Sequence, residues 1–385
     1  CYQQLADIQA EYQKKDSSFF LTQKVTPISC KEIQLSLGAQ TAILEWHIAS
    51  DSFQVFIITK QDLDVVEFDK SSLTSLVNWC EKYQNALFNN IDGWKLSLSR
   101  ELKVLSGILR LEWLLDHPLL KSCNSLIIIA HRYLNLVPMH ALPISSSSEG
   151  TSNTDYVQSR FPFGLSYAPS CQFLQLIQKR NNRKFSQALT VVNPTKDLSY
   201  TALSVNAIRQ KFKHQTLLQE EQATKESFRH HLSGNVHCLH LACHGYFNSQ
   251  NPLLSALVLA SDLSDQGGFD GVSFLPFLKD IVETESDDVV TLQDLVTYDL
   301  RNCQLATMSA CETGMVDFTS LTDEYIGLQS GFLYAGTSAV LSSLWPVRDL
   351  ATSFLMARFY QHLQPETPFS VTLIEAQQWL RAVKK

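Results

Sequence analysis

A cysteine and a histidine each close an apolar run in this sequence. Cys311 closes LATMSAC at 305–311, and His244 closes VHCLHLACH at 236–244. If the two runs are neighbouring parallel strands, both side chains lie at the edge of the sheet where the strands end. A histidine held beside a cysteine can take the thiol proton, and the resulting thiolate attacks carbonyl carbons. The pattern therefore predicts a cysteine protease dyad, with Cys311 as nucleophile and His244 as base and acid.

The oxyanion of such a reaction needs fixed hydrogen-bond donors. We expect the backbone N–H groups of Gly245 and Cys311 to supply them, because Gly245 follows the histidine without a Cβ that would obstruct a substrate. Taken alone, this local pattern fits an inert buried cysteine equally well.

Three carboxylates follow the same set of expected strand ends. Asp197, Asp323 and Asp349 are the candidate substrate-binding residues. Carboxylates beside the dyad favour an Arg or Lys side chain on the substrate, which predicts cleavage after a basic residue. An equally good interpretation is that Asp323 and Asp349 cap the helices that follow them.

Other histidines and cysteines near the dyad have structural interpretations. His237 and His240 alternate with leucines and should face a helix layer or solvent rather than join the site. The side chain of Cys243 should point to the face opposite His244, because successive residues of a strand alternate. We expect Cys238, Cys243 and Cys303 to be core residues.

Composition excludes several classes of function. The chain has 385 residues, of which 45% are hydrophobic and 18% charged, with a net charge of -7. No basic stripe with interleaved aromatic residues is present, so direct nucleic-acid contact is not expected. Nine cysteines without regular spacing predict no disulfide framework and a reducing, cytoplasmic setting. There is no CxxC pair, and we expect neither a metal nor an organic cofactor.

The start of the sequence and one uncharged stretch bear on whether the protein carries a signal peptide or a membrane span. The chain starts at Cys1 without an initiator methionine or a signal-peptide core, so we expect a piece of a longer protein. Residues 325–347 contain no charged residue. Their glycines and serines nevertheless favour a buried helix, a turn and a buried strand over a membrane span.

Periodicity predicts two regions of secondary structure. In the first region we expect a helical tail before residue 30, strands at 41–49, 53–59, 65–68 and 125–130, and helices at 73–87 and 98–115. The polar stretch 145–154 suggests a loop or a domain boundary. The second region alternates, with strands at 188–192, 216–218, 236–243, 254–260, 304–310 and 339–344, and helices at 203–212, 224–232, 292–300, 323–335, 351–363 and 371–383. This alternation predicts an α/β fold, a mainly parallel sheet with helices on both faces. A polar insertion at 262–291 interrupts it.

Several motifs together resemble the CHAT family, caspase-like domains named for the heterocyst differentiation protein HetF and usually attached to TPR repeats. The motifs occur in the family's order and do not separate HetF from its relatives: LVPMHAL at 136–142, YAPS at 167–170, VHCLHLACHG at 236–245, LATMSACETG at 305–314, DEYIGLQSGFLYAG at 323–336, AVLSSLWPVRDLAT at 339–352 and EAQQWL at 375–380. The family's catalytic histidine and cysteine fall on His244 and Cys311.

This resemblance implies a caspase-like sheet of the clan CD type and a catalytically silent α/β N-terminal half. It divides the chain into a helical tail at 1–30 that ends a TPR array, a pseudo-caspase-like region at 31–155, and a CHAT protease domain at 156–385. It also implies a cysteine endopeptidase with a regulatory role that cleaves protein substrates through an acyl-enzyme. A protein activator or TPR-bound regulator is then an expected partner, and a membrane is not.

Two alternatives come from other functional classes. One is a protein-interaction scaffold that keeps a caspase-like fold with an idle dyad, although the intact histidine and cysteine argue against it. The other is a nucleotide-binding α/β protein, which is weak because no GxGxxG or P-loop run follows any expected strand.

Overall fold

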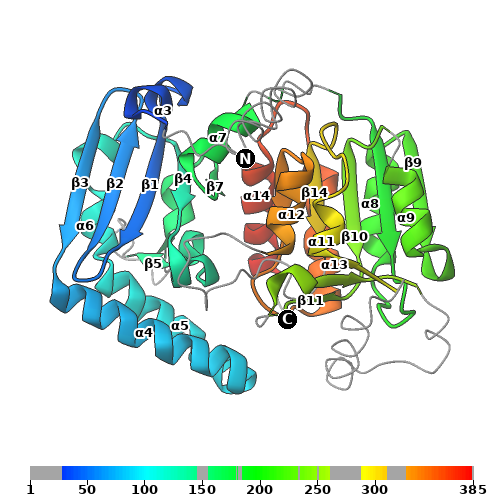
Figure 1. The fold of residues 1–385 in the computed structure, drawn as a ribbon, viewed down its shortest axis with the longest axis horizontal. Helices are drawn as coiled ribbons and strands as arrows, with labels where there is room; N and C mark the ends of the chain where they lie inside the picture. Colours follow the sequence, from blue (N-terminus) through cyan, green and yellow to red (C-terminus); the bar gives the residue numbers. More distant parts are fainter. Residues whose placement is uncertain are drawn as a thin grey trace, which may run out of the picture.

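The computed structural model describes residues 28–144, 155–178, 180, 184–232, 235–248, 251–260, 288–309 and 327–383. Two five-stranded sheets organise the chain, and Figure 1 shows them on opposite sides of the view with helix α14 between them. The predicted helical tail at 1–30 falls almost wholly outside the described residues, as do the loop 145–154 and most of the insertion 262–291. Among the described helices, none combines the length and apolar character that a membrane crossing requires.

The first sheet has the strand order β3-β2-β1-β4-β7. Its strands β1, β2 and β3 form an antiparallel meander, whereas β4 runs parallel to β1 and β7 runs parallel to β4. The bounds are β1 (Thr41–Ile48), β2 (Phe53–Thr59), β3 (Leu63–Phe68), β4 (Ser125–Ile129) and β7 (Leu165–Tyr167). A two-stranded ribbon, β5 (Pro143–Ile144) and β6 (Asp155–Tyr156), lies between β4 and β7 in the chain.

Alternating side chains cover both faces of the first sheet. In β1, Ala42, Leu44 and Trp46 enter the larger core with helices α4, α5 and α6, while Ile43 enters a smaller core with α3 and α7. The helices are α3 (Cys30–Ser36), α4 (Lys70–Asn89), α5 (Ile91–Ile108), α6 (Leu111–Leu115) and α7 (Cys171–Gln178). The expected single helix at 98–115 is two helices, because Arg110 adopts a left-handed φ of 47° between them.

The second sheet is parallel throughout, with the order β15-β14-β10-β8-β9. This confirms the predicted mixed α/β fold with a parallel sheet. The strands are β8 (Gln187–Val192), β9 (His214–Gln219), β10 (Cys238–Ala242), β14 (Leu305–Met308) and β15 (Ala339–Leu341). A small antiparallel sheet of β11 (Gly245–Tyr246), β12 (Ala256–Val258) and β13 (Val289–Thr291) follows β10.

Helices cover both faces of the second sheet, as the alternation predicts. Leu239 and Leu241 of β10 pack on the side of α9, α11 and α12, while Cys238 packs on the side of α8, α13 and α14. Full burial of one such leucine contributes about 1.5–3 kcal/mol. The helices are α8 (Ala202–Lys211), α9 (Lys225–Leu232), α11 (Leu292–Leu295), α12 (Leu328–Ala335), α13 (Asp349–His362) and α14 (Phe369–Ala382).

The domain division between residues 155 and 156 stays a prediction, while the first sheet itself extends to Tyr167. Strand β7 is the reason, because its parallel pairing with β4 completes the first sheet. Gly164 makes the approach to β7 possible: its φ is 111°, and a Cβ there would collide with the Ser370 side chain at the start of α14. The end of the first sheet is therefore fitted closely against the last helix of the chain.

Two aromatic side chains from the second half are packed into the core of the first half. Phe247, three residues after His244, is a buried member of that core. Trp345, in the segment after β15, packs edge-on against the buried Trp94 of α5, with 5.1 Å between ring centroids. Both residues come from segments beyond the carboxyl ends of the second sheet. The first half therefore anchors chain segments that adjoin the candidate site.

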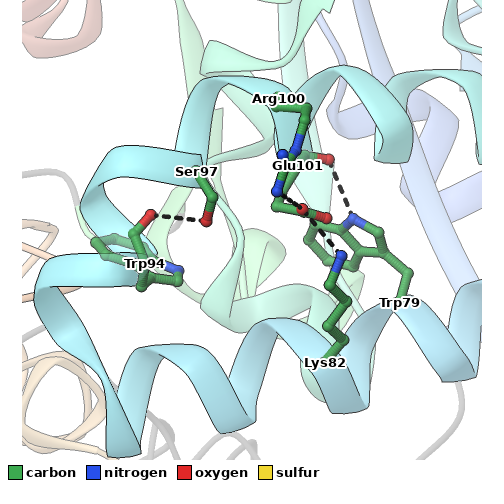
Figure 2. Close-up of polar contacts among 6 residues, drawn as sticks. All are labelled: Trp79, Lys82, Trp94, Ser97, Arg100 and Glu101. Carbon is green, nitrogen blue, oxygen red and sulfur yellow. Dashed lines mark hydrogen bonds and ion pairs between the residues drawn. The ribbon is translucent and has the colours of Figure 1, made fainter.

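The helix pair α4 and α5 of the first half carries a buried carboxylate. Figure 2 shows Glu101 between Lys82 and Arg100, whose nitrogens lie 3.0 and 3.1 Å from its Oε1. The Trp79 indole donates to the Glu101 backbone oxygen at 3.0 Å. Burial raises the pKa of Glu101, but the hydrogen bonds from Lys82 and Arg100 outweigh it and hold the pKa below its ordinary value. The charged carboxylate therefore joins the two helices.

Replacing this carboxylate tests the contribution of the cluster to stability. We expect Glu101→Gln to lower the free energy of unfolding by about 1 kcal/mol near neutral pH, since the charge-assisted bonds become neutral ones. The difference should disappear as the pH falls below the ordinary glutamate value of 4.5, because the folded-state pKa is depressed and protonation removes the same charge. Urea unfolding of both proteins across acidic pH measures it. Glu81→Gln, at an exposed position of α4, is the matched control and should behave like the unaltered protein.

Candidate functional site

The predicted positions of His244 and Cys311 follow two neighbouring parallel strands. Strand β10 pairs with β14 in the register Leu241 to Met308, and the Ser309 N–H donates to the Leu241 carbonyl at 2.8 Å. The described chain stops at Ser309, so Cys311 lies outside the described residues, and so does Asp323. The strand that leads to the cysteine therefore runs directly beside the strand that leads to the histidine.

His244 is held at its backbone and at its ring. Its carbonyl accepts a hydrogen bond from Val258 N at 2.9 Å, which ties the residue to β12. Its Nε2 lies 2.8 Å from Oδ2 of Asp197, and the two side chains are only 16% and 14% exposed. A carboxylate can only accept, so Nε2–H is the donor. The imidazole is therefore fixed in one orientation at the end of β10.

Asp197 reaches the histidine from a tight turn after β8. Asn193 N donates to the Ala242 carbonyl at 2.8 Å, and the Asn193 side-chain oxygen accepts from Leu198 N at 2.8 Å. Asn193 and Lys196 have left-handed φ values of 49° and 64°, which fold the turn back toward the sheet. Thr195 Oγ1 donates to Asp197 Oδ1 at 2.5 Å. Both carboxylate oxygens of Asp197 thus have internal partners.

These contacts set the charge of Asp197. Burial raises the pKa of its carboxyl group, but the hydrogen bonds from His244 and Thr195 outweigh burial, so the pKa lies below its ordinary value. The group is therefore ionised at neutral pH. An ionised carboxylate bonded to one ring nitrogen fixes the tautomer of a histidine and stabilises its protonated form.

The backbone N–H of Gly245, which we expect to be an oxyanion donor, has a defined direction in the β11–β12 ladder. Gly245 pairs with Leu257 across β11 and β12, and the Val258-to-His244 hydrogen bond occupies the neighbouring position of the ladder. In an antiparallel ladder bonded and non-bonded pairs alternate, so the Gly245 N–H points away from β12. This amide is thus directed out of the ladder directly after His244.

Asp349 is half-buried, and both of its carboxylate oxygens have partners within the protein. Its Oδ2 accepts from Tyr200 N at 2.9 Å, and its Oδ1 accepts from Ser353 Oγ at 3.1 Å. The residue is the first of α13, whose N-cap is Arg348, so Asp349 does not cap this helix as the alternative interpretation expects. It also ties α13 to the segment that carries Asp197.

The other histidines and cysteines of this region are structural, as expected from the strand alternation. His240 is 1% exposed, its Nδ1 lies 2.7 Å from Thr307 Oγ1, and its Nε2 lies 3.2 Å from Ser204 Oγ. Burial lowers its pKa to about 3, so it remains neutral. The buried cysteines of the two strands and their flanks behave as core residues: Cys238, Cys243 and Cys303.

Within the part of the chain that the structure describes, no three His, Cys, Asp or Glu side chains gather as a metal site would need. The position of Asp197 after a strand predicts a substrate-binding residue, whereas the structure pairs the carboxylate with His244. The one sequence signal for this role is the turn Asn193-Pro-Thr-Lys-Asp197 after a buried strand. That signal says nothing about which side chain the aspartate meets.

Comparison with known proteins provides a family and remote structural likenesses. The CHAT domain model matches residues 102–385. Comparison with curated proteins gave no match. Among solved structures, the Arg-specific cysteine proteinase gingipain R (RGPB) aligns with a TM-score of 0.42 and 10% identity, over 72% of this chain and 62% of that one. A complex of Porphyromonas gingivalis RgpB pro- and mature domains aligns with a TM-score of 0.40 and 11% identity, over 72% and 63%.

This chain therefore spans less than two thirds of those proteinases. The family model covers well over half of the chain and includes both β10 and β14. The chain belongs to the CHAT domain family.

Proposed function

We propose that this protein is a cysteine endopeptidase with a caspase-like site, in which Cys311 is the nucleophile, His244 the base and acid, and Asp197 the residue that orients His244. The observation that carries the proposal is the 2.8 Å pair of His244 and Asp197 at the carboxyl end of β10. Strand β14 lies beside β10, and Ala310 stands in the sequence between Ser309, which the structure describes, and Cys311. Two residues span at most about 7 Å, and this short distance supports the proposed pairing of Cys311 with the histidine.

The proposed reaction uses the second ring nitrogen of His244. Because Nε2 donates to Asp197, Nδ1 takes the proton of the Cys311 thiol. The sulfur attacks the peptide carbonyl carbon, and the backbone N–H groups of Gly245 and Cys311 hold the oxyanion. His244 then gives its proton to the leaving amine as the C–N bond breaks. Water, deprotonated by His244, hydrolyses the thioester, releases the carboxylate product and restores the thiol.

The proposed preference for a basic residue now depends mainly on Asp323. Asp197 and Asp349 engage both of their carboxylate oxygens inside the protein, so their contacts lend no support to a role in binding a substrate cation. We retain cleavage after Arg or Lys as part of the proposal, with Asp323 as the partner of that side chain. We also propose that the protein has a regulatory role, that it acts in the cytoplasm, and that a protein activator orders its site.

Loss of the nucleophile provides the first test. We expect Cys311→Ala to abolish new protein termini when the full chain is incubated with a candidate proteome, because no acyl-enzyme can form. We also expect a chloromethyl ketone to label Cys311 faster than the exposed Cys30 in the same molecule, since the proposed dyad gives Cys311 a neighbouring base. Equal termini from both proteins, together with equal labelling of the two cysteines, would indicate an idle scaffold.

Loss of the carboxylate behind the histidine provides the second test. We expect Asp197→Asn to lower kcat/KM by at least about tenfold, because the amide no longer stabilises the protonated imidazole. Alkylation of Cys311 should require a higher pH in this variant, whereas the loss of a purely structural contact would leave that profile in place. Glu221→Gln is the matched control, since Glu221 binds Lys196 of the same turn without touching His244. Unchanged kinetics and an unchanged alkylation profile would remove Asp197 from the mechanism.

A panel of fluorogenic peptides tests the substrate. We expect peptides with Arg or Lys at the cleaved position to be hydrolysed fastest, and Asp323→Asn to raise KM for those peptides selectively, because the neutral amide no longer pairs with the cation. Asp349→Asn serves for comparison and should change all peptides alike. Preference for Asp or a small apolar residue at the cleaved position would refute the assignment.

A further inference from the structure

Strand β9 forms the outer edge of the second sheet, on the side away from the first sheet (Figure 1). It has six residues, His214–Gln219, and pairs in parallel with β8. Within the described part of the chain, β8 is the only strand that pairs with β9. What the other side of β9 presents depends on which of its backbone groups point away from β8.

The register of the parallel sheet decides which backbone groups of β9 point outward. Asn193 N donates to the Ala242 carbonyl at 2.8 Å, so Asn193 and every second residue before it turn their backbone groups toward β10. Thr190 is one of the residues between them and turns its groups toward β9. In a parallel pair, a residue bonded in this way lies opposite a residue whose groups point away. The residue opposite Thr190 is Leu217, so the N–H and C=O of Leu217 point outward.

Three residues of β9 share this outward direction, because backbone directions alternate along a strand: Gln215, Leu217 and Gln219. The groups that bond to β8 belong to the residues between them. Among the described residues, no backbone hydrogen bond of a turn, loop or cap involves any of these three. Such a row of outward N–H and C=O groups is a template for pairing with another strand.

The other edges of the two large sheets are protected against association, whereas β9 is not. Strand β3, the outer edge of the first sheet, also has six residues, but Asp64 and Glu67 lie within it. Strands β7 and β15 have only three residues each and line one cavity between the two sheets. Charged side chains and short strands are common means of preventing edge-to-edge pairing. Strand β9 is as long as β3 and contains no Asp, Glu, Lys, Arg or Pro.

The residues at the two ends of β9 have opposite charges. Lys213 precedes the strand and is exposed, whereas Glu220 and Glu221 follow it. Glu221 binds Lys196 of the same chain, so Glu220 is the main acidic group of this end. When two copies of β9 pair antiparallel, the basic end of each strand meets the acidic end of the other, which is favourable. Parallel pairing would bring like charges together. The edge is therefore complementary to itself in the antiparallel direction, which indicates a second copy of this chain as the partner.

We propose that this protein forms a homodimer in which the β9 edges of two copies pair antiparallel, with Leu217 at the two-fold axis. In this register Leu217 lies opposite the same residue of the other copy, and Gln215 lies opposite Gln219. All outward residues then form bonded pairs, with about six backbone hydrogen bonds in total, whereas sliding the strands by two residues would leave one outward residue of each copy unpaired. The half-buried Leu217 side chain gains an apolar neighbour across the axis. This association does not depend on the proposed peptidase activity.

The first experiment uses the unaltered full chain. Sedimentation velocity from about 1 to about 300 µM should show a change from monomer to dimer, because a contact of this size supports only a weak association. Across the same range, hydrogen exchange resolved to single amides should slow at Gln215, Leu217 and Gln219, since the dimer engages these N–H groups. The amides of Thr216 and Leu218 bond to β8 and should be protected at every concentration. A chain that stays monomeric, or a dimer that leaves exchange of the three outward amides unchanged, would overturn the proposal.

The second experiment uses the symmetry of the interface. Leu217→Lys and Leu217→Glu each set like charges against one another at the axis, so each variant alone should raise the dissociation constant of the dimer at least about tenfold. An equimolar mixture of the two should dimerise again, because opposite charges then meet. Val65→Lys, at an exposed position of the edge strand β3, is the matched control and should dimerise as the unaltered chain does. Single variants that dimerise normally, or a mixture that stays monomeric, would refute the axis at Leu217. Should either variant not fold, the exchange measurement on the unaltered chain still decides.

Discussion

The hydrogen bond between His244 and Asp197 joins the ends of two parallel strands, and the rest of the candidate site depends on it. Asp197 follows β8 and His244 follows β10, so the bond forms only because these strands are neighbours in the same direction. The Asn193 amide, bonded to the carbonyl of Ala242, holds the turn of the aspartate against the strand of the histidine. The hydrogen bond to Asp197 thus fixes the ring of His244 from the side of β8.

Burial separates the roles of two histidines that lie four residues apart. His240 is inside the sheet, bonded to Thr307 and Ser204, and its burial makes protonation unfavourable. Thr307 also lies 2.7 Å from the Tyr360 hydroxyl, so this network links β10, β14 and α13. A buried polar network of this kind stabilises only when its members are satisfied. His244 lies beyond the end of the same strand, where its ring is bonded to the carboxylate of Asp197.

The first half of the chain provides packing contacts for segments that adjoin the candidate site. Its core takes up Phe247, which follows His244 and Gly245, and Trp345, which follows β15. Both segments leave the second sheet at its carboxyl edge, where loops alone would have few contacts to order them.

The periodic elements and the two reactive residue types can be predicted from the sequence. Apolar patterns predict β1, β2, β8 and β10 to within about two residues, because a strand that is buried on one or both faces needs apolar side chains there. The order of strands and helices predicts a parallel sheet. Two features become visible only in the folded chain: β7 belongs to the first sheet, and Asp197 is bonded to His244. The reason is physical: periodicity reports which face of an element is buried, whereas the partner of a polar side chain depends on which turns the folded sheet brings together.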